Sequence, residues 1–147
     1  MFSLTEAPID AEAVRKAVAS TGAGAVVVFH GTVRDETRGR RVLYLEYEAY
    51  PAMALRAMES LALDVAREFR LSGIACTHRL GRLDLGEAAV VLAVAAPHRK
   101  AALLAVEAYV ARMKRDVPIW KKEHFEGGSV WVGSADDPQG ERSEPSA

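Results

Sequence analysis

Cationic side chains recur at the predicted ends of helices and strands in this sequence of 147 residues. Arg34 follows a predicted strand, His98 and Arg99 open a predicted helix, and Lys114 closes that helix. Helix starts and strand ends leave backbone N–H groups unpaired, and these groups add to side-chain charge when an anion docks. Most surface lysines and arginines are only solvated charges. A local site for a phosphate-bearing substrate is nevertheless the chemistry that this set suggests.

Two lysines around Pro118 differ from ordinary surface charges. Lys114 continues the predicted apolar stripe of its helix, so we expect partial burial, which favours the neutral form that acid–base chemistry requires. Pro118 cannot continue the helix, and a rigid turn there can bring Lys121 near Lys114. Two ammonium groups at close range favour loss of one proton. The sequence therefore predicts proton transfer by lysines, with Lys122 and Glu123 beside the second.

Several other kinds of site are disfavoured. The histidines show no i,i+4 pair and no cysteine pair accompanies them, so we expect no metal site. Cys76 lies in a strand pattern, which is more typical of a buried thiol than of a nucleophile, and there is no Gly-x-Ser-x-Gly elbow. Glu46 and Glu48 lie on one face of a predicted strand, where they are either paired acids or the ordinary polar positions of an alternating pattern. His78-Arg79 ends a strand and is equally ambiguous.

Helix and strand patterns follow one another without regular βαβ order, which predicts an α+β fold with a mainly antiparallel sheet and about three helices. Asp10 is expected to cap the first helix. The predicted helices cover about 10–19, 51–70 and 98–114, and the predicted strands about 25–29, 42–50, 74–80, 88–95 and 129–132.

Three further expectations concern individual segments. The first strand, 25–29, is apolar on both faces and should be central in its sheet. Residues 35–41 are charged and contain a glycine, which predicts a mobile loop. Alternation along 42–50 places Leu43, Leu45 and Tyr47 on one face.

Composition limits the class of protein. A hydrophobic content of 50% supports one compact domain over 1–133, whereas 134–147 lacks apolar residues and should be a disordered acidic tail. A net charge of −1 and 7% aromatic residues disfavour nucleic-acid binding, and no apolar run is long enough to span a membrane. The single cysteine and the charged N-terminus predict a cytoplasmic protein.

Five short motifs in register resemble the catalytic large subunit of molybdopterin synthase. The resemblance covers roughly 24–132, and the last motif is the most distinctive. The motifs are 29–34 (FHGTVR), 45–50 (LEYEAY), 78–81 (HRLG), 97–99 (PHR) and 118–123 (PIWKKE).

The resemblance implies that two sulfurs are transferred to cyclic pyranopterin monophosphate, giving the dithiolene of molybdopterin. It implies a donor, a small ubiquitin-like carrier subunit whose C-terminal Gly-Gly ends in a thiocarboxylate, which explains the lack of a cysteine nucleophile. It also implies a homodimer within a heterotetramer, with no resident cofactor. Because the sequence ends in Pro-Ser-Ala and not in Gly-Gly, we do not expect it to be the carrier.

Matched by position, the resemblance implies catalytic roles for Lys114 and Lys121 and substrate contacts at seven further residues. These are Thr32, Val33, Arg34, His98, Arg99, Lys122 and Glu123. His98 and Lys114 are 16 positions apart in one predicted helix, which corresponds to about 24 Å. A site that uses both would need two subunits. A non-catalytic module that binds a phosphorylated ligand or a partner's tail through the same cations is the alternative.

Overall fold

The computed structural model describes residues 1–132 and 142–145, which form three helices and ten strands. The helices are α1 (Ala11–Ala17), α2 (Pro51–Phe69) and α3 (Arg99–Asp116). The strands are β1 (Phe2–Thr5), β2 (Ala25–Thr32), β3 (Glu36–Thr37), β4 (Arg40–Ala49), β5 (Gly73–Arg79), β6 (Gly81–Asp84), β7 (Ala88–Ala96), β8 (Ile119–Phe125), β9 (Gly128–Val132) and β10 (Arg142–Pro145).

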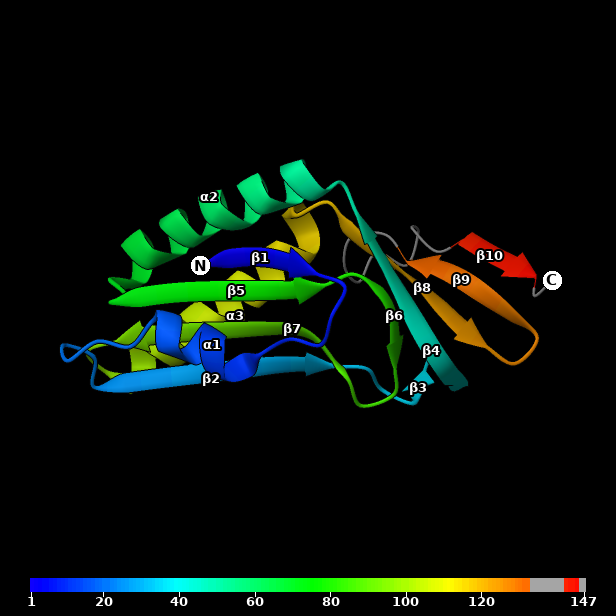
Figure 1. Ribbon diagram of the computed structural model, residues 1–147, viewed down its shortest axis with the longest axis horizontal. Helices are drawn as coiled ribbons and strands as arrows, with labels where there is room; N and C mark the ends of the chain where they lie inside the picture. The colour runs from blue at the N-terminus through cyan, green and yellow to red at the C-terminus, as the bar shows by residue number, and fades with distance from the viewer. Residues whose placement is uncertain (133–141, 146–147) are drawn as a thin grey trace.

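The first sheet has the order β1-β5-β7-β2 and carries helices on both faces. In Figure 1, α1 lies in front of this sheet and α3 behind it, while α2 runs along the side of β1. Every residue of β7 after Ala88 is buried, and successive side chains enter two different apolar clusters, one against α2 and α3 and one against α1. The alternation of a strand thus builds two cores from one apolar run.

The helix ends follow local chemistry. The Asp10 carboxylate accepts a hydrogen bond from the backbone N–H of Ala13 at 3.1 Å, which confirms the predicted cap. Pro51 occupies the first turn of α2, where its missing N–H group costs nothing, and Arg70 ends that helix in a left-handed conformation. Val117 ends α3 directly before Pro118.

The second sheet has the order β10-β9-β8-β4-β3, and β6 also pairs with β4. Although β6 lies between β5 and β7 in the sequence, it leaves their sheet and crosses to this one (Figure 1). Only β1 and β5 pair in parallel among the described strands. The predicted fold class, α+β with mainly antiparallel sheets and three helices, is therefore confirmed.

The predicted central position of the first strand is wrong. β2 pairs with β7 alone and forms an edge of its sheet, and the exposed fraction of Val26 is 44%. β5 and β7 hold the two inner positions, because each of them pairs with a strand on both sides. An apolar run in the sequence therefore does not distinguish a central strand from an edge.

The predicted mobile loop at 35–41 is also wrong. Thr37 pairs with Arg40, and the two residues between them, Arg38 and Gly39, have φ of 52° and 75°. Two positive φ angles form the tight turn that matches the twist of a two-stranded hairpin. The segment is therefore a β-hairpin.

Alternation along β4 is interrupted. The pairing with β8 shifts between Val42 and Tyr44, and the intervening Leu43 is 45% exposed while Val42 and Leu45 are buried. A bulge inserts one residue on one strand and reverses the facing of those before it. The predicted shared face of Leu43 with Leu45 is wrong for this reason.

Five of the described strands were not predicted. The sequence pattern missed β1 and β6, treated β3 as part of a loop, assigned a turn to the segment that forms β8 and placed β10 in the tail. Within the predicted tail, 134–141 and 146–147 lie outside the described residues. The four residues between them form β10, antiparallel to β9, because β9 offers them an unpaired edge. Within the described ranges, none of the helices has the length and apolar character that a membrane span requires.

Candidate active site

A cavity of about 480 Å³ opens where the two sheets meet. Its wall combines the end of β2, the end of α3, the turn after β3, and parts of β4, β5, β7, β8 and β9. Phe29, Val90, Val110 and Met113 form an apolar floor. Charged side chains from other elements surround this floor, so the cavity can accept a ligand with both a ring and an anionic group.

Both predicted catalytic lysines line this cavity. Lys114 comes from the last turn of α3, and Lys121 comes from β8, after the short link through Pro118. The sequence-based grouping of the two lysines is therefore reproduced by the geometry.

The reason given for Lys114 needs correction. The buried residues of α3 are Ala102, Ala105, Tyr109 and Met113, so Lys114 lies one position past the buried stripe and is exposed. The predicted partial burial of Lys114 is therefore wrong. Its position in the cavity comes from the end of the helix facing the sheet junction.

Glu123 shares the cavity with Lys121. The Lys121 ammonium nitrogen lies 3.7 Å from Oε1 of Glu123, whose side chain is only 7% exposed. Lys122, between them, takes the opposite face of β8, where its ammonium nitrogen lies 5.1 Å from the centre of the Trp131 ring. The alternation of the strand thus presents Lys121 and Glu123 to the cavity and directs Lys122 away from it.

The three predicted residues at the end of β2 separate in the same way. Thr32 and Arg34 are exposed and line the cavity. The Val33 side chain is 5% exposed and packs with the buried cluster that includes Val42, Leu45 and Leu83. Val33 therefore does not present its side chain to a ligand in the cavity.

His98 and Arg99 lie at the other end of α3, away from this cavity. His98 is the N-cap of the 18-residue helix, Arg99 is its first residue, and both are exposed. Lys114 belongs to the last turn of the same helix, so the rise per residue separates the two ends by about 24 Å. Within one chain, these two cations and the two lysines cannot contact one small substrate.

The inner wall also contains the partly buried Tyr47 and the buried His78. Burial, with a further contribution from the charge of Glu123, raises the pKa of Tyr47 to about 12. Burial lowers the pKa of His78 to about 4, although the carbonyl of Arg79 accepts a hydrogen bond from His78 Nδ1 at 2.8 Å and opposes this shift. The rings of Tyr47 and His78 meet edge to face with centroids 4.9 Å apart. Both side chains are therefore uncharged at neutral pH.

Sequence reasoning missed other members of the wall. Arg38 was interpreted as an ordinary surface charge, yet it lines the cavity from the turn of the β3–β4 hairpin. The signal that could have found it is Arg-Gly between two short extended segments, a pattern typical of tight hairpins. Glu46 and Glu48 do not contribute: Oε1 of Glu46 lies 2.7 Å from Nε2 of His124 outside the cavity, and Glu48 is exposed.

Two further predictions concern the Cys76 thiol and a metal site. Cys76 lies in β5 with none of its surface exposed, and burial raises its pKa to about 12, so the prediction of a buried thiol is confirmed. Across 1–132 and 142–145, no three metal-ligating side chains of His, Cys, Asp or Glu gather in one place.

Known proteins are similar to this chain over most of its length. Residues 4–116 match the family model described as MoaE protein. The molybdopterin synthase catalytic subunit of Bacillus subtilis (strain 168) is 47% identical over 132 residues, which cover 90% of this chain and 84% of that protein. The chain belongs to the MoaE protein family.

Other MoaE proteins agree. The corresponding subunit of Halalkalibacterium halodurans is 44% identical over 132 residues, 90% of this chain and 85% of its own length. The crystal structure of molybdopterin synthase from Staphylococcus aureus matches 88% of this chain and 95% of its own with a TM-score of 0.84 and 40% identity. The predicted family, and with it the assignment as a sulfur-transferring molybdopterin synthase catalytic subunit, is confirmed.

One further MoaE-like structure bears on the fold alone. A chain from a complex of subunits 1 and 2 of the molybdopterin-converting factor of Helicobacter pylori matches with a TM-score of 0.73 at 20% identity. It covers 93% of this chain and 93% of its own length.

Proposed function

We propose that the cavity between the two sheets is where sulfur passes from the C-terminal thiocarboxylate of a small ubiquitin-like carrier subunit to cyclic pyranopterin monophosphate. The observation that carries this proposal is the convergence of Lys114 and Lys121 from different elements on one cavity that also contains Arg34. Two such transfers give the dithiolene of molybdopterin. The sulfur arrives on the carrier, which agrees with a lone cysteine that is buried in β5.

The two lysines act on the carrier's terminal carboxyl group. In each transfer, the sulfur uses its electron pair to bind a carbon of the pterin and displaces an oxygen substituent, which leaves with the C–O electron pair and takes up a proton. Water then replaces the sulfur on the carboxyl carbon. Negative charge develops on the carboxyl oxygen as this exchange proceeds. Ammonium groups aimed at that oxygen stabilise it and supply the protons that the exchange requires.

Other residues of the cavity hold the substrate and support the lysines. Arg34 and Thr32 line the cavity and bind the phosphate of the pterin. Glu123 orients Lys121, and Lys122 supports β8 from its other face. Val33 positions Arg34 without binding the substrate itself, because its side chain is buried and its backbone N–H and carbonyl are hydrogen-bonded to Glu87 and Gly86.

His98 and Arg99 require a second copy of the chain. Because they lie about 24 Å from Lys114 along α3, they complete the cavity of a partner subunit. The proposed assembly is a homodimer of this chain flanked by two carrier subunits. It holds no resident cofactor and works in the cytoplasm, where a lone reduced cysteine is ordinary.

Turnover with thiocarboxylated carrier and cyclic pterin tests this function, with the dithiolene product measured by mass. Lys114→Ala and Lys121→Ala should each reduce product formation by roughly 100-fold or more, as loss of a proton-transfer group does. Lys16→Ala, in α1 on the far side of the first sheet, is the matched control and should turn over normally. Near-normal turnover by a folded Lys114→Ala or Lys121→Ala variant would contradict the assignment.

A further inference from the structure

We propose that the ion pair between Arg79 and Glu87 is a positioning device that fixes Arg34 in the cavity and thereby sets how tightly the phosphate of the substrate is held. This inference rests on the proposed function of the cavity. Neither Arg79 nor Glu87 lines the cavity. Their effect passes through a turn and two backbone hydrogen bonds.

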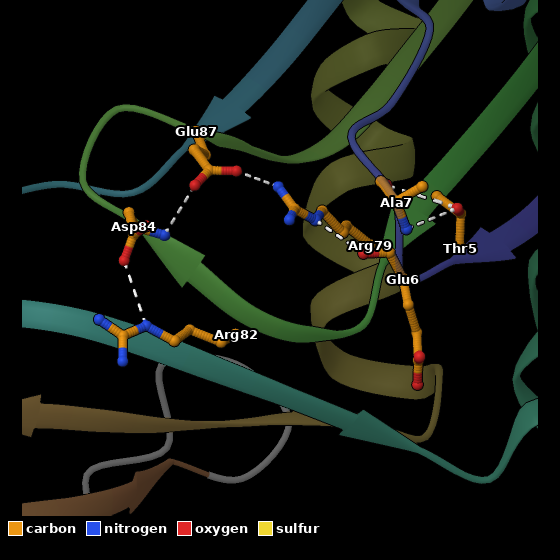
Figure 2. Close-up of polar contacts among 7 residues, drawn as sticks. All are labelled: Thr5, Glu6, Ala7, Arg79, Arg82, Asp84 and Glu87. Atoms are coloured by element: carbon orange, nitrogen blue, oxygen red, sulfur yellow. Dashed lines mark hydrogen bonds and ion pairs between the residues drawn. The ribbon is translucent and has the colours of Figure 1, made fainter.

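The pair itself is partly shielded from water. Nη1 of Arg79 contacts Oε2 of Glu87, and the Arg79 side chain is only 12% exposed while that of Glu87 is 35% exposed. Nε of the same guanidinium donates to the backbone carbonyl of Glu6 at 3.4 Å. Figure 2 shows Arg79 stretched between these two acceptors. Partial burial makes the loss of one member costly, because the other charge is left unpaired.

Glu87 uses its second carboxylate oxygen to close a turn. Oε1 accepts a hydrogen bond from the backbone N–H of Asp84 at 3.2 Å, and the backbone N–H of Glu87 donates to the carbonyl of Asp84 at 3.2 Å. This turn joins β6 to β7, so it stands between the two sheets (Figure 2). The carboxylate therefore connects the rigid end of β5, through Arg79, to an otherwise exposed turn.

The same turn holds Val33. The backbone N–H of Val33 donates to the carbonyl of Glu87 at 3.0 Å, and the carbonyl of Val33 accepts from the N–H of Gly86 at 2.9 Å. Because the Val33 side chain is buried as well, this residue is fixed on all sides. A shift of the turn must therefore move Val33.

Arg34 follows Val33 directly and lines the cavity. On its other side, the carbonyl of Asp35 accepts from the N–H of Val42 at 2.8 Å, which fixes the chain again. The backbone of Arg34 is thus held between two anchors, one on β4 and one on the Glu87 turn. The second anchor depends on Arg79 and Glu87, which makes the ion pair the support of the phosphate-binding side chain.

The turn offers a matched pair of substitutions. Glu87→Gln removes the charge but keeps an oxygen that can accept from the N–H of Asp84. Asp84→Asn removes the neighbouring Arg82–Asp84 ion pair, whose side chains are 62% and 63% exposed, without altering the Arg79–Glu87 contact. Both substitutions exchange a carboxylate for an amide in the same turn (Figure 2).

The experiment measures kcat and KM for the cyclic pterin with the carrier-loaded complex. Since misplacement of a binding group by about 1 Å can cost on the order of 100-fold, we expect Glu87→Gln to raise KM roughly tenfold. Its kcat should stay within about twofold, because the lysines are untouched. Asp84→Asn should leave both constants unchanged. An unchanged KM in Glu87→Gln would overturn the proposal.

A double-mutant cycle separates positioning from general loss of structure. In an Arg34→Ala background, Glu87→Gln should raise KM by less than about twofold, because the side chain through which it acts is gone. Equal effects of Glu87→Gln in the two backgrounds would overturn the proposal. If Glu87→Gln fails to fold, Arg79→Gln replaces it in the cycle, since it removes the cation that pairs with Glu87.

A readout without turnover distinguishes failure of this inference from failure of the proposed function. Inorganic phosphate is titrated into each variant while NMR follows the Arg34 Nε–H and the Val33 amide. We expect weaker phosphate binding and faster Val33 amide exchange in Glu87→Gln, and wild-type behaviour in Asp84→Asn. Absence of turnover by the wild-type protein would contradict the proposed function but not the positioning role. Unaltered phosphate binding and amide exchange in Glu87→Gln would refute the positioning role alone.

Discussion

Lys121 and Glu123 form an ion pair that is buried at one end and open at the other. Their charged atoms are 3.7 Å apart, and the exposed fraction is 32% for the lysine side chain and 7% for the carboxylate side chain. The two residues are alternate positions on one face of β8. The carboxylate is therefore a fixed support, and the ammonium group is the part that a ligand can reach.

Replacing that support tests its contribution. Glu123→Gln keeps the shape and removes the charge that orients Lys121, so we expect turnover to fall roughly 10- to 100-fold. Product formation with loaded carrier is the measurement. Glu48→Gln on the exposed part of β4 is the control and should behave as wild type. Turnover of Glu123→Gln within twofold of wild type would show that Lys121 needs no partner.

The proposed shared site predicts complementation between two inactive variants. One carries His98→Ala and Arg99→Ala, and the other carries Lys114→Ala. After subunit exchange at equal amounts, half of the dimers are mixed and each mixed dimer has one intact site, so activity should recover to about a quarter of wild type.

A second mixture provides the control for complementation. Lys114→Ala and Lys121→Ala affect residues of the same chain's cavity, so neither site of their mixed dimer is intact and no activity should return. Lack of recovery in the first mixture, with subunit exchange verified by native mass spectrometry, would show that His98 and Arg99 do not complete the partner's site.

Stability should depend on pH through His78. Its pKa is about 4 in the folded protein, below the ordinary value of 6.5, so between these values the unfolded chain binds more protons. The contribution of His78 to the free energy of unfolding is therefore fully present above pH 6.5. It is lost as pH falls, by about 2 kcal/mol between pH 7 and pH 5. Urea unfolding at the two pH values measures this loss. His78→Gln should show a smaller difference, and an equal difference in both proteins would contradict the prediction.

Cys76 should be inert in the folded protein. Burial removes access and raises the pKa of the thiol to about 12, so reaction with Ellman's reagent should be on the order of 100-fold slower than after unfolding, or slower still. Because the chain has one cysteine, the absorbance reports that thiol alone. Cys76→Ala should retain sulfur transfer within about twofold of wild type. Loss of transfer in a folded Cys76→Ala variant would implicate the thiol in the reaction.

Local signals in the sequence predicted much of this fold. The Asp10 cap, Pro51 at the start of α2 and Pro118 after α3 each impose a boundary through their own backbone chemistry. Strand order is different, because it depends on partners distant in the sequence. Nothing within 25–29 reveals that β2 forms an edge, and the buried row of β7 needs helices on both faces to explain it.

The sequence predicted that the two lysines share one site, but not the structural reasons that bring them there. Lys114 and Lys121 do meet in one cavity, yet Lys114 is exposed and Lys121 comes from a strand where a turn was expected. Arg38 was interpreted as a surface charge, because a two-residue turn gives only a weak pattern. The roles of Arg79 and Glu87 were beyond the sequence, since neither touches the cavity and their connection runs through backbone groups.

The crossing of β6 from one sheet to the other has a mechanical consequence. This strand continues the chain of β5 into β7 while its backbone is hydrogen-bonded to β4. Separation of the sheets would have to break that ladder, so the joint resists bending. We therefore expect the width of the cavity at the joint to change little when a ligand binds. Its selection among pterins should follow ligand dimensions, with little adjustment of the protein to a poorly fitting one.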